Sequence, residues 1–205
     1  METIKKEKDI KKLFGYTFYP LDCSPEENKK EKEKYHVTLA SGIDNYADTH
    51  DTSKGYIVSI ESKIKACKDS KEIAKLFCKM IIDDQNSDYK NSGVYLWYYK
   101  DDLIYIGEAE NIYERFKNGY GNISPRNIFY GGQSTNCKMN YVMEHAKIKP
   151  KIYYMVCSNP DKRKDIEKEL LKRVREENEK NSKPVFMLYN YRGNKKEYRR
   201  DNLDL

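Results

Sequence analysis

Residues 93–107 read GVYLWYYKDDLIYIG, and this stretch decides the fold of the second half of the chain. Two runs of aromatic and β-branched residues, GVYLWYY and LIYIGEA, are separated by the polar turn KDD. Such runs on either side of a short polar turn predict a β-hairpin. If the two strands pair so that Tyr95 and Tyr105 face the same side, their hydroxyls can converge.

The chain after the hairpin alternates helical and strand-like patterns. A glycine- and asparagine-rich loop is expected over 118–134. The expected elements, in order, are a helix over 109–118, a helix over 135–148, a strand over 151–157, a helix over 161–180 and a short extended segment over 183–190. This order predicts an α+β fold in which a small mixed or antiparallel sheet is flanked by helices.

The first half of the chain is strongly charged and is expected to be mainly helical. Ser24-Pro25-Glu26-Glu27 combines an N-cap, a proline at the first helical position and an acidic residue after it, which predicts a helix start. Apolar residues at helical spacing predict a further helix over 72–81. The polar segment 83–93 is the expected boundary. The chain is therefore divided into an N-terminal extension (1–89), a catalytic domain (90–192) and a basic tail (193–205).

Basic residues are distributed unevenly along the chain. Residues 1–89 hold 16 lysines and no arginine against 17 acidic residues, whereas residues 90–205 hold 23 basic against 16 acidic residues. All eight arginines lie from Arg115 onward. Because the planar guanidinium suits phosphate, the second part is the better candidate for contact with nucleic acid. A solvated basic surface is the alternative.

Composition also excludes some classes of protein. No apolar run approaches the roughly 20 residues that span a bilayer, so no membrane partner is expected. The first residues lack the apolar segment of a secretory signal, and a cytoplasmic location is expected. The five cysteines lack CxxC spacing, which argues against a disulfide framework and a structural zinc site.

Residues suited to phosphodiester hydrolysis recur through the second half. This reaction needs a base for water, a cation for the phosphate and ligands for a metal. Tyr95 and Tyr105 would lie on paired strands, and Arg115 follows on the next helix with a guanidinium for a phosphate oxygen. Glu167, on the long helix, offers the hard oxygen ligand that suits magnesium.

These elements in this order resemble the GIY-YIG nuclease superfamily. Gly93-Val94-Tyr95 is similar to the first half of the name motif, and Tyr105-Ile106-Gly107 matches the second half. A helix with an arginine, a Glu-x-x-Leu-Leu-Lys segment and a terminal Tyr-Asn follow. The resemblance covers about residues 92–191 and is closest to small restriction-type members. It does not extend to residues 1–89.

The resemblance assigns roles to individual residues. The general base corresponds to Tyr95 or Tyr105, and the resemblance does not decide between them. The catalytic arginine corresponds to Arg115 and the supporting asparagine to Asn190. The metal-binding glutamate corresponds to Glu167, with Glu169 as the alternative if the register slips by two. The family uses one divalent metal, here Mg²⁺ or alternatively Mn²⁺, and leaves 5′-phosphate and 3′-hydroxyl ends.

The chain departs from the family pattern in the helix that carries the arginine. Family members usually place a tyrosine or histidine one turn after the arginine, where this chain has Gly119. Tyr120 is the neighbour. Either the helix ends early and Tyr120 enters the site, which we favour, or the group is missing.

Residues 123–140 also resemble an insert of small GIY-YIG proteins. The segment contains a glycine-rich loop that leads into a helix N-terminus, which suits contact with phosphates or base edges. The expected nucleic-acid-binding residues are Arg126, Lys138, Gln133 and Asn136.

The resemblance therefore implies a divalent-metal-dependent endonuclease acting on double-stranded DNA, with a type II restriction enzyme as the preferred role. A single site of this kind cuts one strand, so a duplex break needs a homodimer or two successive binding events. The alternatives are a repair- or homing-type nuclease and a catalytically inactive nucleic-acid-binding protein on the same fold.

Overall fold

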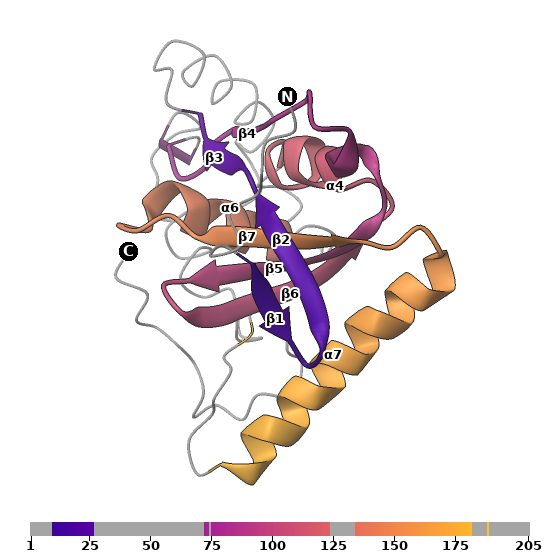
Figure 1. Ribbon diagram of the computed structural model, residues 1–205. Coiled ribbons are helices and arrows are strands. Elements are labelled where there is room, and N and C mark those ends of the chain that lie inside the picture. The colour runs from indigo at the N-terminus through magenta and orange to yellow at the C-terminus, as the bar shows by residue number, and fades with distance from the viewer. Residues whose placement is uncertain (1–9, 27–71, 74, 124–133, 182–187, 189–205) are drawn as a thin grey trace, which may run out of the picture. The chain divides into compact units, whose positions relative to one another are not determined.

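The computed structural model describes residues 10–26, 72–73, 75–123, 134–181 and 188. Within them, five strands form an antiparallel sheet in the order β1-β2-β7-β5-β6, and β3 pairs with β4 in a separate two-stranded sheet (Figure 1). The strands are β1 (Lys11–Leu13), β2 (Tyr16–Leu21), β3 (Cys23–Pro25), β4 (Met80–Ile82), β5 (Gly93–Tyr99), β6 (Asp102–Ala109) and β7 (Lys151–Val156). The expected α+β class, with an antiparallel sheet and helices, is confirmed.

The helical elements follow the expected order in the second half of the chain. They are η2 (Ser87–Lys90), α4 (Ile112–Glu114), the π-helical η3 (Arg115–Tyr120), α6 (Ser134–His145) and α7 (Pro160–Lys180). None of the helices in the described ranges is long and apolar enough to cross a membrane.

Two compact units divide the chain. The first, called here the sheet unit, contains Met1–Asp22, Asp83–Tyr113 and Pro150–Asp204. The second contains Cys23–Ile82, Glu114–Lys149 and Leu205. In this division the strands β1 and β2 belong to the sheet unit, and β4 groups with residues after the hairpin, while the expected functional division at residues 89/90 and 192/193 stays a prediction. Each unit is described by itself.

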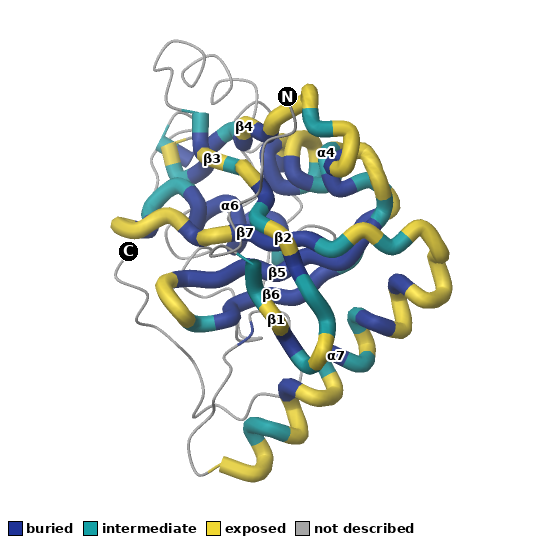
Figure 2. Tube along the Cα trace, viewed as in Figure 1, coloured by how far each residue is buried: buried dark blue, intermediate teal, exposed yellow. Residues whose placement is uncertain are grey.

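The hairpin of the sheet unit forms where the sequence predicts it. β5 and β6 pair along their whole length, with a register shift between Trp97 and Tyr98. Lys100, in the turn, has a φ of 56°. Every residue of β5 is buried (Figure 2), and β6 and β7 pair with its two edges. This burial explains why GVYLWYY is apolar or aromatic throughout.

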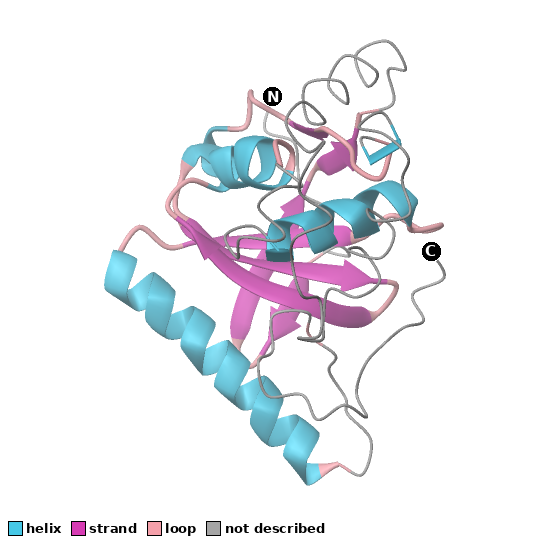
Figure 3. Ribbon diagram, turned by 180° about the vertical axis from the view of Figure 1, so that it is seen from behind, coloured by secondary structure: helices cyan, strands magenta, loops and turns pink. Residues whose placement is uncertain are grey.

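The core of the sheet unit lies on the face that α7 covers. Val94, Leu96 and Ile106 of the hairpin cluster with buried side chains of α7. The α7 residues in this cluster are Ile166, Leu170 and Val174, which recur at helical spacing. Figure 3, which views the molecule from behind, shows α7 running along the sheet. Burial of each such aliphatic side chain contributes roughly 1.5–3 kcal/mol.

The N-terminal strands β1 and β2 extend the sheet. β2 pairs with β7 through Tyr19 and Tyr154, Pro20 and Tyr153, and Leu21 and Ile152. β1 pairs with β2 around a turn in which Phe14 and Gly15 have φ values of 50° and 88°. Of the extension expected over residues 1–89, residues 1–9 and 27–71 lie outside the described residues.

Two helix predictions in the second unit are wrong. Ser24 and Pro25, predicted to start a helix, lie in β3, where Ser24 pairs with Ile81 of β4. Of the helix expected over 72–81, only Glu72 and Ile73 are helical among the described residues. Strand pairing and burial of alternating side chains replace helical periodicity here, as Met80 and Ile82 are buried while Ile81 is exposed.

Candidate active site

Tyr95 and Tyr105 lie side by side on one face of the sheet. Tyr95 pairs with Gly107, and Tyr105 pairs with Trp97 on the neighbouring strand. Directly paired residues of antiparallel strands share a face, and alternate residues of one strand also do. The two rings are stacked, with centroids 6.1 Å apart and planes inclined by 20°. Convergence of the two hydroxyls requires this shared face.

Gly107 provides the space that the phenol of Tyr95 occupies. A Cβ added at Gly107 would lie 2.5 Å from the Tyr95 Oη and 2.7 Å from Cε1 of Tyr105. Any larger residue would therefore displace at least one ring. The glycine of the YIG triplet is explained here by contact with the tyrosine of the facing strand, and both tyrosines are buried.

The neighbouring tyrosines of the hairpin differ in environment. Tyr98 follows the register shift and belongs to the core on the α7 side, where its ring meets that of Tyr153 edge to face. Burial, with a smaller contribution from Tyr153, raises the pKa of Tyr98 to about 12. A phenol that holds its proton this strongly is unsuited to accept one from water near neutral pH.

Glu169, the alternative metal ligand, is engaged elsewhere. Its Oε2 accepts a hydrogen bond of 2.7 Å from the Tyr16 hydroxyl, and its Oε1 lies 2.5 Å from the Nη2 of Arg173. The Tyr16 hydrogen bond is the largest cause and lowers the pKa of the Glu169 carboxyl; desolvation opposes the shift, and the charge of Arg173 adds to the lowering. The bond to Tyr16 joins β2 to α7, and the pair with Arg173 lies within α7.

Glu167 lies on α7 beside its buried stripe. It is half-buried and falls one turn after Arg163, a buried residue whose side chain reaches β6. Residues four apart on a helix lie on the same face, so the row that carries Glu167 is directed toward β6. β6 is the outermost strand in the sheet order and carries Tyr105.

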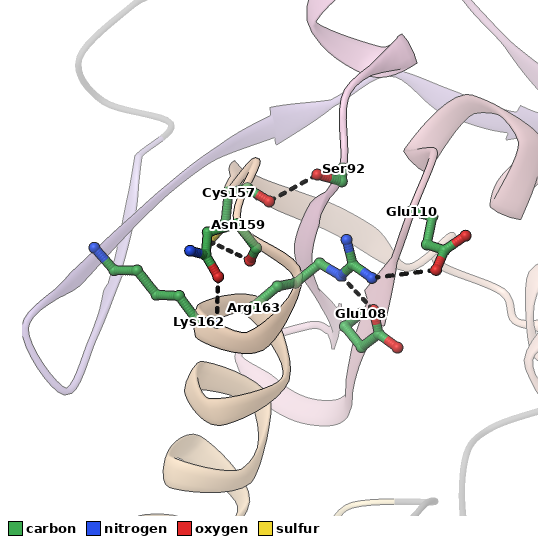
Figure 4. Close-up of polar contacts among 7 residues, drawn as sticks. All are labelled: Ser92, Glu108, Glu110, Cys157, Asn159, Lys162 and Arg163. Atoms are coloured by element: carbon green, nitrogen blue, oxygen red, sulfur yellow. Dashed lines mark hydrogen bonds and ion pairs between the residues drawn. The ribbon is translucent and has the colours of Figure 1, made fainter.

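Arg163 is a residue that the sequence analysis missed. Its Nε lies 2.5 Å from the Oε2 of Glu108, and its Nη2 lies 3.8 Å from the Oε1 of Glu110 (Figure 4). Arg163 is 2% exposed. The available signal was its position: with Ile166 and Leu170 it continues the buried stripe of α7, where a charged side chain is unexpected.

In the second unit, Arg115 lies against Tyr120. The guanidinium carbon of Arg115 is 4.6 Å from the centre of the Tyr120 ring, and Nη2 is 3.5 Å from the Tyr120 hydroxyl. The first distance is that of a cation–π contact, and the second is at the outer limit of a hydrogen bond. Tyr120 is fully buried and packs on Phe116 as well.

The π-helical turn explains how Tyr120 takes the place next to Arg115 despite Gly119. In η3 the backbone N–H of Gly121 donates to the carbonyl of Phe116, five residues earlier, over 2.9 Å. The wider turn accommodates one extra residue. Residues five apart, such as Arg115 and Tyr120, can then meet as residues four apart do in an α-helix. A Cβ at Gly119 would lie 3.2 Å from the Arg115 Cδ, so the arginine side chain lies over the glycine. We expected the helix to end early. It continues instead as a wider π-helical turn.

Asn140 holds the end of this turn in place, and the sequence analysis missed it too. Its Nδ2 donates to the carbonyl oxygens of Tyr120 and Cys78, each over 2.6 Å, and its Oδ1 accepts from the Cys78 N–H over 2.9 Å. Asn140 is fully buried on α6. An amide with one acceptor and two donors fits these three partners, which no apolar residue could satisfy. The signal for it was a polar residue in a helix that is otherwise expected to pack.

The expected nucleic-acid-binding residues divide between buried and undescribed positions. Asn136 and Lys138, on α6, are 7% and 8% exposed. Direct contact with DNA would require these side chains to become accessible, and their role stays a prediction. Arg126, Gln133 and the supporting Asn190 lie outside the described residues.

The residues present fit a metal site with a single protein carboxylate. Mg²⁺ commonly binds proteins through one or two carboxylates, with waters and substrate phosphates completing its shell. Glu167 offers one such carboxylate, and the carboxylate of Glu169 binds Tyr16 and Arg173. The described ranges hold no group of three or more His, Cys, Asp or Glu side chains suited to a metal, so a site built wholly of protein ligands is not found there.

The described cysteines are not in disulfides. They are Cys23, Cys78, Cys137 and Cys157, and Cys67 lies outside the described residues. Burial raises the pKa of the Cys23 thiol to about 12 and that of Cys137 further, which makes both poor nucleophiles.

No protein-family model, curated protein or solved structure matches the chain. Function is therefore inferred from the order of the motif residues and from the geometry described above.

Proposed function

We propose that the protein is a divalent-metal-dependent endonuclease of the GIY-YIG type, which hydrolyses DNA to 5′-phosphate and 3′-hydroxyl ends. The observation that carries the proposal is the stacked pair Tyr95 and Tyr105 over Gly107. A side chain at position 107 would meet the rings of both Tyr95 and Tyr105. This contact supports the proposal because it gives the tyrosine and the glycine of the pattern a shared steric reason.

In the proposed mechanism, one tyrosine of the pair acts as its phenolate and takes a proton from the attacking water, which leaves a neutral phenol. Tyr95 and Tyr105 both remain candidates for this base. Arg115 offers its guanidinium to the phosphate oxygen on which negative charge develops. The ring of Tyr120 supports the aliphatic and cationic parts of Arg115 and limits the orientations that its side chain can adopt.

Glu167 would hold the divalent metal in this scheme. When bound, Mg²⁺ would supply Lewis-acid stabilisation of the leaving oxygen. The tyrosines lie on the face of the sheet away from the α7 core, so Glu167 has to reach them past the edge of β6. Two features support this route: β6 is the last strand of the sheet, and the row of α7 that contains Glu167 is directed toward it.

A type II restriction enzyme is the role we favour, as it is for the small members that the chain resembles. A homodimer would then place two active sites on one duplex, each of which cuts one strand. A repair- or homing-type nuclease would share the chemistry and differ in substrate. The inactive rival, a nucleic-acid-binding protein, is weakened by the Arg115–Tyr120 contact, which restores the group that Gly119 lacks.

Matched tyrosine substitutions on one hairpin test the proposal. Tyr95→Phe and Tyr105→Phe each remove one hydroxyl. The variant that lacks the general base should cleave plasmid DNA about 100-fold or more slowly than the wild type in the presence of the metal. Tyr99→Phe is the control, because the Tyr99 hydroxyl is buried without a hydrogen-bond partner among the described residues. Wild-type activity in both Tyr95→Phe and Tyr105→Phe, as in Tyr99→Phe, would exclude a tyrosine base.

The pattern of products separates the roles. Discrete fragments from plasmid or genomic DNA would support a restriction enzyme, whereas preference for branched substrates would support a repair role. DNA binding by pure protein without cleavage in Mg²⁺ or Mn²⁺, on methylated and unmethylated DNA, would support the inactive rival.

A further inference from the structure

A buried arginine joins α7 to β6 next to the proposed site. The guanidinium of Arg163 binds Glu108, which is 26% exposed, and approaches Glu110, which is 89% exposed. Its Nη2 is buried and has no hydrogen-bond partner among the described residues. The dashed contacts of Figure 4 place Arg163 between the start of α7 and the end of β6.

Stability alone is a weak reason for a charge at this position. Burying an ion pair costs desolvation energy that its attraction often fails to recover, and a well-packed apolar residue frequently stabilises a fold as much or more. The rest of the stripe, formed by Ile166, Leu170 and Val174, is apolar. An apolar stripe is non-directional, whereas a guanidinium–carboxylate bond holds one helix residue against one strand residue.

The start of α7 is also held from the other side of the hairpin. Cys157, which precedes the helix, accepts a hydrogen bond from the Ser92 hydroxyl over 2.7 Å and donates its N–H to the Ser92 carbonyl over 2.9 Å. The Asn159 side chain caps the helix by accepting from the Lys162 N–H over 3.0 Å. The first turn is therefore tied to the beginning of β5 and, through Arg163, to the end of β6.

Both ends of the Arg163–Glu108 bond adjoin residues of the proposed site. Glu108 directly follows Gly107, which lies beneath the phenol of Tyr95. Glu167 follows Arg163 by one helical turn. A shift of α7 along β6 would therefore move the Glu167 carboxylate relative to the tyrosine pair while the apolar core stayed buried.

We propose that Arg163 is a positioning residue, which acts through Glu108 to hold the Glu167 carboxylate at the edge of β6 in the orientation that a divalent metal requires. This inference rests on the proposed nuclease function. Mg²⁺ accepts only near-octahedral geometry at 2.0–2.1 Å, so a single protein ligand has to be placed closely. Residues that orient ligands typically influence metal affinity by 10- to 100-fold.

The test compares Arg163→Met, which keeps the length and removes the charge, with the conservative Arg163→Lys. The concentration of Mg²⁺ at half-maximal cleavage should rise by about tenfold or more in Arg163→Met, with KM for DNA unchanged, and by less in Arg163→Lys. Hydrogen exchange, which is independent of activity, should show lost protection in residues 160–168 and unchanged protection in residues 172–180.

A folded Arg163→Met variant with the Mg²⁺ dependence of the wild type would overturn the inference, because the arginine would then be only structural. If Arg163→Met fails to fold, Glu108→Gln and Arg163→Lys provide the same comparison from either side of the bond. The proposed function fails separately, and the inference with it, if the wild type does not cut DNA in Mg²⁺ or Mn²⁺.

Discussion

The phenol of Tyr95 lies across the backbone of Gly107, the residue that pairs with it on the neighbouring strand. A methyl group at Gly107 would come within 2.5 Å of the Tyr95 hydroxyl oxygen. The two halves of the GVY…YIG pattern are therefore parts of one contact: one strand supplies the ring, and the other supplies the absence of a side chain. This contact also keeps Tyr95 beside Tyr105.

Substitution Gly107→Ala should displace the phenol of Tyr95 and impair both stability and cleavage. Overpacking of this kind costs about 1–3 kcal/mol in free energy of unfolding. The same change in a Tyr95→Ala background should cost less, because the phenol that it meets is gone, although contact with Tyr105 remains. Urea unfolding of the four proteins measures this coupling. Additive effects would show that Tyr95 does not occupy the space over Gly107.

Asn140 should be essential for the turn that carries Arg115 and Tyr120. Asn140→Leu leaves the Cys78 N–H and two carbonyl groups without the side chain that binds them, at roughly 1–3 kcal/mol for each buried group left unsatisfied. Asn122→Leu, at an exposed position just after the turn, is the control for the loss of an amide. If Asn140→Leu unfolds in urea at the same midpoint as the wild type, the Asn140 hydrogen bonds do not stabilise this turn.

The Tyr16–Glu169 hydrogen bond should stabilise the sheet unit over a defined pH range. It lowers the pKa of Glu169 from 4.5 and raises that of Tyr16 from 10.0. Because the pKa of Glu169 is lowered by folding, this carboxylate contributes stability that is present above pH 4.5 and is lost as the pH falls through the pKa of the folded state. Because the pKa of Tyr16 is raised by folding, this phenol contributes stability that is present below pH 10.0 and is lost as the pH rises through the pKa of the folded state.

Tyr16→Phe should therefore lower the urea midpoint between these two pH values, and the difference from wild type should shrink toward acid. Tyr99→Phe, which removes a hydroxyl with no hydrogen-bond partner among the described residues, should not lower the midpoint. Since Glu169 has no catalytic role in the proposal, cleavage by folded Tyr16→Phe should equal that of the wild type. A deficit that persists unchanged well below pH 4 would contradict the assigned cause.

The hairpin and α7 could be predicted because their signals are local. GVYLWYY and LIYIGEA have the composition of strands on their own, and the stripe of Ile166, Leu170 and Val174 recurs at helical spacing. The motif residues lie within or beside these elements. Sequence pattern was therefore sufficient to locate Tyr95, Tyr105 and Glu167 on their elements, but not to give their distances.

The N-terminal strands could not be predicted because their partners are distant in sequence. β2 is stabilised by pairing with β7, more than 130 residues later, and its own sequence YTFYPL contains a proline. Ser24-Pro25-Glu26 has the local pattern of a helix start, yet Ser24 and Pro25 pair with β4. Tertiary pairing overrides local propensity in both segments.

The geometry around Arg115 was also beyond sequence pattern. Helical spacing of four residues places Gly119 after Arg115, and only the π-helical hydrogen bond from Gly121 to Phe116 brings Tyr120 to that position. This wider turn depends on Asn140, which comes from another helix and binds the Tyr120 carbonyl. No periodicity within the segment itself indicates it.

The central claim, that Glu167 serves a metal-dependent nuclease site, is tested most directly by plasmid cleavage with a matched pair of variants on α7. Glu167→Gln and Glu169→Gln each remove one carboxylate from the same helix. In Mg²⁺ the wild type and Glu169→Gln should cut, Glu167→Gln should lose about 100-fold or more of the activity, and EDTA should abolish all cleavage. Cleavage by Glu167→Gln at the wild-type rate, or loss in Glu169→Gln alone, would contradict the account.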